Sequence, residues 1–175
     1  MDYFTSKSMF MKLMFGAILF FSSSCFAQKD SIAPAYKRYP TVPAFQLFLT
    51  DSTVKYTKES LPKKRPTLIM LFSPDCEHCK HHAEQMFANK EALKGINIVM
   101  ATSSPIYRMK EFAETYRLYE MENVVVAKDP YYLLVGFYEI KSLPYLAMYD
   151  KKGKLIQTFE GSLGIDKVLQ IFQNN

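Results

Sequence analysis

Hydrophobic and polar positions follow a regular pattern between residue 41 and the C-terminus, and this pattern predicts alternating strands and helices. Three continuous apolar runs are typical of strands that are buried on both faces: residues 67–72, 96–101 and 123–127. Apolar residues at helical spacing follow each run and predict helices over residues 76–89, 107–121 and 131–138. In the first of these helices, Ala83, Met86 and Phe87 are expected to face the core. The alternation favours an α/β fold.

Paired strands are predicted before and after the alternating region. The pairs are residues 45–49 with 54–56, and residues 145–149 with 155–159. The second pair is joined by a polar turn in which Gly153 is free to adopt a positive φ. A closing helix is predicted over residues 165–172. The expected element order is β-β-β-α-β-α-β-α-β-β-α, without an internal repeat.

The first 27 residues have the layout of a secretory signal. Lys7 and Lys12 precede an uncharged apolar stretch at 13–21, and small residues follow it. As a helix, this stretch would span only about 14 Å, less than half the hydrocarbon core of a bilayer, so a permanent membrane span is not expected. Two processing routes remain open, cleavage after Ala27 or lipidation of Cys25, and the first is favoured because the lipobox residues are atypical.

The rest of the chain is expected to form a short lead-in and one globular domain. Residues 28–40 contain two prolines among charged and small residues and predict a flexible lead-in, which leaves residues 41–175 for the domain. The 175-residue chain is 49% hydrophobic with a formal net charge of +5, which excludes a disordered or collagen-like chain. Lysines are scattered among acidic residues, so binding to nucleic acid is not expected.

The candidate chemistry lies where the first buried strand turns into a helix, at Cys76 and Cys79. Backbone N–H groups at a helix start lack intrahelical acceptors, and together with the helix dipole they lower the pKa of a cysteine there. Cys76 is therefore predicted to be the exposed nucleophile, and Cys79 the shielded thiol that resolves a mixed disulfide. A ring of four residues removes little chain entropy, which argues against a purely structural disulfide.

Charged residues beside the pair are expected to tune its pKa values. A cation at His78, between the two cysteines, would stabilise a thiolate. Asp75 and Glu77 act in the opposite direction. The reduction potential of the pair therefore does not follow from the sequence.

The histidines raise a second possibility. All three of them, His78, His81 and His82, fall in this segment, and His81 and His82 are expected on a solvated helix face. Cys76, Cys79 and His82 would also suit zinc or copper(I) as three ligands. Outside this segment, no Cys or His follows residue 27 that could complete a tetrahedral site, so a metal is the weaker interpretation.

Together these residues resemble the thioredoxin-like superfamily, and within it the exported thiol-disulfide oxidoreductases of the TlpA-like (ResA-like) type. The resemblance extends from about Val42 to Phe172. It rests on Phe-x-x-x-Cys-x-x-Cys at 72–79, Ser-Leu-Pro-Tyr at 142–145, the leading hairpin and the closing turn. It implies a thioredoxin-like α/β fold: a central mixed sheet flanked by helices, with an N-terminal β-hairpin extension.

The resemblance also implies roles for residues outside the Cys-x-x-Cys segment. In this family a cis proline packs beside the cysteines, and Pro144 matches it. Its neighbour Leu143 would offer backbone groups to an extended substrate, with Phe72 as a further substrate contact.

The sequence departs from the family pattern at three positions. Asp75 replaces the usual Trp, Met70 stands where thioredoxin has a buried acidic proton acceptor, and Glu84 replaces a helix proline. These departures argue against thioredoxin-style general reduction. They leave Glu84 or one of the histidines as open candidates for proton transfer.

The function implied is disulfide exchange in the periplasm or cell envelope, in the reductase direction, without a cofactor beyond the Cys76–Cys79 dithiol. The implied partners are cysteine-containing exported proteins or apocytochromes as substrates, and a membrane electron donor. Two alternatives stay open: a metal-handling protein of the copper-chaperone kind, and a non-catalytic interaction module.

Overall fold

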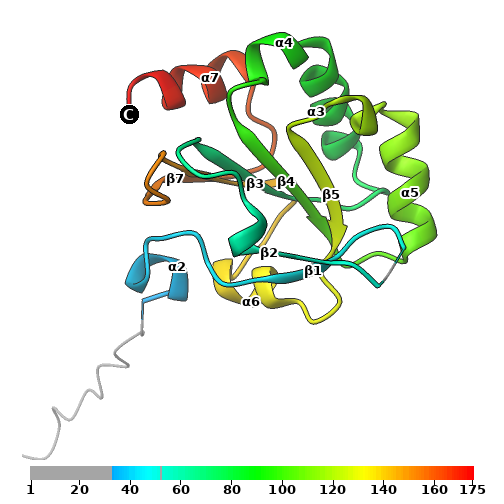
Figure 1. Cartoon of the computed structure of the whole chain (residues 1–175), viewed down its shortest axis with the longest axis horizontal. Helices are drawn as coiled ribbons and strands as arrows, with labels where there is room; N and C mark the ends of the chain where they lie inside the picture. Colours follow the sequence, from blue (N-terminus) through cyan, green and yellow to red (C-terminus); the bar gives the residue numbers. More distant parts are fainter. Residues whose placement is uncertain (1–32, 52) are drawn as a thin grey trace, which may run out of the picture. The chain divides into compact units, whose positions relative to one another are not determined.

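The computed structural model describes residues 33–51 and 53–175, which form a compact unit beginning at Ala33 (Figure 1). The expected signal segment, with Cys25 and the cleavage position after Ala27, lies outside the described residues. No helix within 33–51 and 53–175 has the length and apolar character needed to cross a bilayer.

A seven-stranded mixed sheet with the order β2-β1-β5-β4-β3-β6-β7 forms the centre of the unit. The bounds of its strands are β1 Gln46–Phe48, β2 Lys55–Thr57, β3 Thr67–Leu71, β4 Asn97–Thr102, β5 Val124–Lys128, β6 Tyr145–Tyr149 and β7 Leu155–Glu160. β3, β4 and β5 are parallel, whereas β6 and β7 continue the sheet antiparallel beyond β3. The β1–β2 hairpin extends the sheet antiparallel beyond β5. The predicted mixed sheet with its N-terminal hairpin is confirmed.

Two layers of helices cover the sheet, one on each face (Figure 1). One layer contains α3 Glu77–Ala88, α4 Lys90–Leu93, α5 Ile106–Thr115 and α7 Ile165–Gln173, and the other contains α2 Ala35–Arg38 and α6 Leu133–Tyr138. Short 3-10 turns occur at η1 Lys58–Ser60 and η2 Leu118–Glu120. Every residue of β3, β4 and β6 is buried, because these strands have core on both faces.

The helix predicted over 107–121 is shorter than expected. It begins at Ile106 and ends at Thr115, because Arg117 adopts a left-handed backbone conformation with φ 57°. A single η2 turn follows and buries Leu118. In the sequence, apolar residues continue at helical spacing past Thr115. A positive φ at an arginine cannot be recognised from the sequence, so the end of the helix was not predicted.

The lead-in predicted over 28–40 is partly folded. From residue 33 onwards it belongs to the compact unit, so the domain begins eight residues before the predicted boundary at 41. Its helix α2 places the Tyr36 ring 6.1 Å from that of Tyr138 on α6. The Pro40 carbonyl accepts a hydrogen bond from the Leu155 amide at 2.8 Å. Ring packing and a strand-like backbone contact therefore hold this segment on the domain.

Candidate active site

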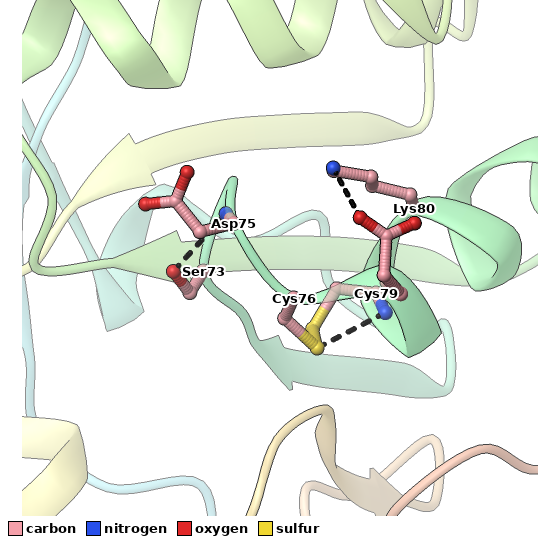
Figure 2. Close-up of a disulfide and its surroundings, with 6 residues drawn as sticks. Ser73, Asp75, Cys76, Cys79 and Lys80 are labelled. Carbon is pink, nitrogen blue, oxygen red and sulfur yellow. Dashed lines mark hydrogen bonds and ion pairs between the residues drawn. A yellow bond between two sulfur atoms is a disulfide. The ribbon is translucent and has the colours of Figure 1, made fainter.

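The cysteines lie where β3 passes into α3, at the C-terminal edge of the parallel strands. Cys76 is the N-cap of α3, with φ −85° and ψ 112°. Its sulfur accepts a hydrogen bond from the Cys79 backbone N–H at 3.2 Å, which Figure 2 shows as a dashed line. The same N–H also donates to the Cys76 carbonyl at 3.0 Å, so this amide of the first helical turn is shared between the carbonyl and the sulfur.

A disulfide joins Cys76 to Cys79, with their Cα atoms 5.2 Å apart (Figure 2). The two sulfurs differ in exposure: Cys76 is half-buried, and Cys79 is fully buried with 0% exposure in the core under α3. Only one of the pair can therefore meet an incoming disulfide.

The carboxylates beside the cysteines have cationic partners. Asp75 is ion-paired with Arg108, which reaches over from α5. Glu77 is bonded to Lys80 at 2.6 Å. These pairs offset the negative charge that the sequence placed around Cys76. His78 is exposed between the cysteines. Arg108 was not anticipated, because its pairing depends on the packing of α5 beside α3.

His82 does not lie on a solvated helix face, contrary to expectation. Its side chain is 1% exposed, and its Nε2 atom is buried without a hydrogen-bond partner among the described residues. Burial, with a smaller contribution from the charge of the neighbouring His81, lowers the pKa of His82 to about 4. The buried face of α3 consists of Cys79, His82, Ala83 and Met86. Because Cys79 and His82 are not typical core residues, the sequence pattern did not show that His82 belongs to this face.

His81 lies on the solvated face as expected, with a side chain that is 62% exposed. Glu84 is also exposed and lies 3.8 Å from the His81 ring. Neither of them is directed into the core beside Cys79.

The Leu143-Pro144 segment reaches the site through the pairing of β6 with β3. The register places Tyr145 opposite Leu71, so the residues that follow β3 adjoin the residues that precede β6. The Leu143–Pro144 peptide bond is cis, and Pro144 is buried. Phe72 packs against Phe112 of α5, with ring centroids 4.6 Å apart.

A cavity of about 340 Å³ opens beside the cysteine segment, at the C-terminal ends of β3, β4 and β5. Phe72 and Leu143, both predicted as substrate contacts, lie in its wall. Polar wall residues are Ser73, Thr102, Ser103, Ser104, Asp129 and Tyr132, and apolar ones include Leu71, Ala101, Val135 and Ile140. The cavity therefore offers both hydroxyl groups and apolar surface beside Phe72 and Ser73, in the segment that leads to Cys76, although neither cysteine is part of its wall.

Asp129 was missed in the sequence, although an acidic residue shortly before a predicted helix is a recognisable capping signal. Its carboxylate is 1% exposed and accepts hydrogen bonds from the amides of Leu133 and Leu134, at 3.0 and 2.9 Å. It therefore holds the first turn of α6, which forms one wall of the cavity.

Replacing Asp129 with alanine is expected to lower the free energy of unfolding by about 2 kcal/mol, because two amides at the start of α6 lose their acceptor in a buried place. Denaturant unfolding at neutral pH measures the change. Asp166→Ala, in the exposed first turn of α7, is the matched control and should cost less than about 0.5 kcal/mol. Equal losses in the two variants would contradict the capping role.

No group of three or more His, Cys, Asp or Glu side chains within the described part of the chain is arranged to hold a metal ion. Cys76, Cys79 and His82, the ligands considered from the sequence, share one helix, but both sulfurs are joined to each other in this structure.

Comparison with solved structures identifies similar folds at low sequence identity. A secreted Mycobacterium tuberculosis disulfide oxidoreductase homologous to E. coli DsbE has a TM-score of 0.63 and 16% identity over 75% of this chain and 96% of its own. The exposed lipoprotein thioredoxin Etrx1 of Streptococcus pneumoniae gives 0.60 and 21%, over 76% and 100%. Peroxidoxin BcpB from Mycobacterium tuberculosis gives 0.64 and 14%, over 77% and 94%. At these identities the likeness concerns the fold.

Sequence comparison identifies a family for this chain but no individual curated relative. No match was found among curated proteins. The family model for a thioredoxin-like domain matches residues 54–174, which includes the sheet from β2 onward, both cysteines and Pro144. With that match over most of its length, and with a disulfide at the junction of β3 and α3 in a mixed sheet, the chain belongs to the thioredoxin-like domain family.

Proposed function

We propose that this protein exchanges disulfides with polypeptide substrates, using Cys76 as the nucleophile and Cys79 as the resolving thiol. The observation that carries the proposal is the asymmetry of the pair. Cys76 is accessible and accepts a helix amide at its sulfur, whereas Cys79 is fully buried behind it. An amide directed at a sulfur stabilises a thiolate, and only the accessible thiolate can attack a substrate.

The reaction proceeds in two exchange steps in the reducing direction. The Cys76 thiolate attacks one sulfur of a substrate disulfide, forming a mixed disulfide and releasing the other substrate sulfur as a thiolate, which takes a proton. Cys79 then loses its proton and attacks the Cys76 sulfur. The Cys76–Cys79 bond forms, and the second substrate sulfur leaves with the electron pair and is protonated. Two electrons pass to the substrate, and the protein ends as the disulfide.

The substrate chain is proposed to lie along Leu143 and Pro144 and to place a side chain in the cavity beside them. The backbone of Leu143 precedes β6 at the same edge as the cysteines, and its side chain joins Phe72 in the cavity wall. An extended segment can there form backbone hydrogen bonds as an added strand does. Pro144, which is buried, connects Leu143 to the start of β6.

The proposal includes the cellular location of the protein and the direction of electron transfer. Two of the structural relatives are described as secreted or as an exposed lipoprotein, which supports an envelope location like that of the TlpA-like proteins. There the protein would act as a reductase on cysteine-containing exported proteins or apocytochromes, with a membrane electron donor restoring the Cys76–Cys79 dithiol. The dithiol itself then carries the electrons, without another cofactor.

The equilibrium between the dithiol and glutathione is the experiment that tests direction. Quenched samples across a series of glutathione ratios give the fraction of protein disulfide and hence the reduction potential. A potential well below that of the glutathione pool supports a reductase. A potential near that of strong oxidants assigns the protein to disulfide formation, and the absence of reversible exchange at Cys76 contradicts the proposal as a whole.

Filling the cavity should separate polypeptide substrates from small ones. Val135→Trp, in the cavity wall on α6, is expected to slow exchange with a scrambled or unfolded protein disulfide by about tenfold while leaving exchange with glutathione unchanged. Leu133→Trp is the control, because Leu133 lies on the same helix, is 44% exposed and is not part of the wall. Equal rates for Val135→Trp and Leu133→Trp would place the substrate elsewhere.

A further inference from the structure

His82 is the buried polar group that the exchange mechanism above leaves without a role. Among the described residues, two further buried side-chain atoms lack a hydrogen-bond partner, Arg108 Nε and the Tyr145 hydroxyl; Arg108 is ion-paired with Asp75, and Tyr145 lies in the core on the other face of the sheet. The remaining buried polar side chains have partners away from this face of α3. Asn97 bonds to Thr67 and to the Pro62 carbonyl, and Asp129 bonds to the start of α6. Thr102 accepts from the Ser104 amide. The His82 Nε2 atom has no hydrogen-bond partner among the described residues. Burying a polar atom without a partner destabilises the fold, so a partner is expected in another redox state of the protein.

The helix directs this ring toward the resolving cysteine. His82 follows Cys79 by three residues on α3, and both side chains are buried on the same face. Long side chains on a helix point back toward its N-terminus and cover the residue three or four positions earlier. By this rule the ring of His82 is expected over the turn that holds Cys79, and in the disulfide form its Nε2 makes no hydrogen bond to the described residues.

Charged groups near α3 lie outside this buried face. On α3 itself, Lys80 is bonded to Glu77, and His81 and Glu84 are exposed. On α5, Arg108 is occupied by Asp75 beyond the helix start, Glu111 is exposed, and Tyr116 is half-buried among aromatic neighbours. On α7, Asp166 and Lys167 are exposed. The buried residues that β3, β4, α5 and α7 contribute to this core are apolar: Leu68, Met70, Ile98, Met100, Met109, Phe112, Ala113, Ile165 and Val168.

We propose, on the basis of the exchange function above, that His82 is a positioning residue whose neutral imidazole donates a hydrogen bond from Nε2 to the Cys79 sulfur when the dithiol is reduced. In the disulfide, both sulfurs are bonded to each other and attract a donor weakly. Reduction turns Cys79 into a thiol that ionises to a thiolate, a strong acceptor in an apolar pocket. His82 thereby stabilises the thiolate that must attack the mixed disulfide.

The imidazole acts as a donor and not as a store for the proton of Cys79. Burial keeps His82 neutral throughout the physiological range, since its pKa is lowered to about 4. A base of that strength holds few protons at neutral pH, so the proton that leaves Cys79 passes to solvent or to the departing substrate sulfur.

The test compares His82→Leu with His82→Gln, which keeps a donor, and with His81→Leu, which removes the exposed neighbouring imidazole. Thiolate absorbance of the reduced proteins, followed against pH, reports two ionisation steps. A hydrogen bond to a charged group is worth about a factor of ten in an equilibrium constant. In His82→Leu the second step, that of Cys79, is expected to move up by about one pH unit while the first step stays. His82→Gln recovers part of the shift, and His81→Leu shows none.

The glutathione equilibrium supplies an independent readout. Relative to wild type, His82→Leu should favour the disulfide by a factor that grows with pH toward about tenfold, equivalent to about 30 mV. A purely structural role would change stability without this pH-dependent ratio. If the Cys79 step and the ratio are both unchanged in His82→Leu, the proposal is overturned.

A measurement on the wild-type protein covers the case in which the leucine variant does not fold. The nitrogen resonance of His82 Nε2 should move on reduction of the disulfide as the hydrogen bond forms, and an unmoved resonance contradicts the proposal. The absorbance and resonance measurements need no substrate, so they still report on His82 if exchange with polypeptides fails. If exchange is normal but neither measurement responds to His82, this inference is refuted and the proposed function stands.

Discussion

Replacing Cys76 with serine will reduce disulfide exchange at least about a thousandfold, because the hydroxyl that replaces the thiol does not ionise near neutral pH and cannot carry the mixed disulfide. The buried Cys79 has 0% exposure and no route to a substrate sulfur. The measurement is the rate at which the reduced variant reduces a protein disulfide, alongside alkylation of its remaining thiol across pH.

Cys79→Ser is the matched variant, because it changes the same atom in the other half of the pair. It should retain fast alkylation of Cys76, which keeps its place at the start of α3, and it should accumulate mixed disulfides that are not resolved. If both single variants alkylate at the same rate, the two sulfurs are equivalent and the assignment of nucleophile and resolving thiol is wrong.

Acidification is expected to destabilise the oxidised protein through His82. The pKa of His82 is about 4 in the folded protein and about 6.5 when unfolded, so between these values the unfolded state binds the additional proton and stability falls as pH falls. The difference of about 2.5 pKa units lowers the free energy of unfolding by at most roughly 3 kcal/mol when the pH falls to 4. Above pH 6.5 this contribution to the pH dependence disappears.

Denaturant unfolding of the disulfide form at pH 7, 5.5 and 4 isolates this contribution when wild type is compared with His82→Leu. Carboxylates titrate in both proteins and cancel, so the variant should lose less stability over this range. His81→Leu serves as the control. Because the His81 ring is exposed, this variant should lose stability between pH 7 and pH 4 nearly as wild type does. Parallel profiles of wild type and His82→Leu would show that the imidazole is hydrated or paired in solution.

The strands could be predicted from the sequence because burial on two faces leaves a continuous apolar signature. The runs 67–72 and 96–101 correspond to β3 and β4 within one residue at each end, and β6 was located at its observed bounds. The helix C-terminus at Thr115 and the folded lead-in could not be predicted in this way. Both depend on tertiary contacts, such as the ring of Tyr36 against that of Tyr138, and not on local periodicity.

The site was predictable where its chemistry is local. The position of Cys76 at a helix start, and the different exposure of the two sulfurs, followed from the strand-to-helix junction alone. His82 was misplaced because a histidine among charged residues looks solvated, and only the packing of α3 against the sheet shows that it faces inward. Arg108 joins the site only through folding, so no spacing in the chain pointed to it, whereas the position of Asp129 before a predicted helix was a capping signal that could have been read.

The cavity shares Leu71, Phe72 and Ser73 with the junction that carries the dithiol, but the rest of its wall comes from other stretches of the chain. The sulfurs belong to the β3–α3 junction, whereas much of the cavity wall comes from residues 129–140, a segment that Asp129 secures through its own hydrogen bonds to α6. Under the proposed exchange function, mutations in that segment are expected to alter which polypeptides fit without disturbing Cys76 and Cys79. On that proposal, natural selection could diversify substrate preference among descendants of one ancestral domain while the cysteine pair is inherited intact.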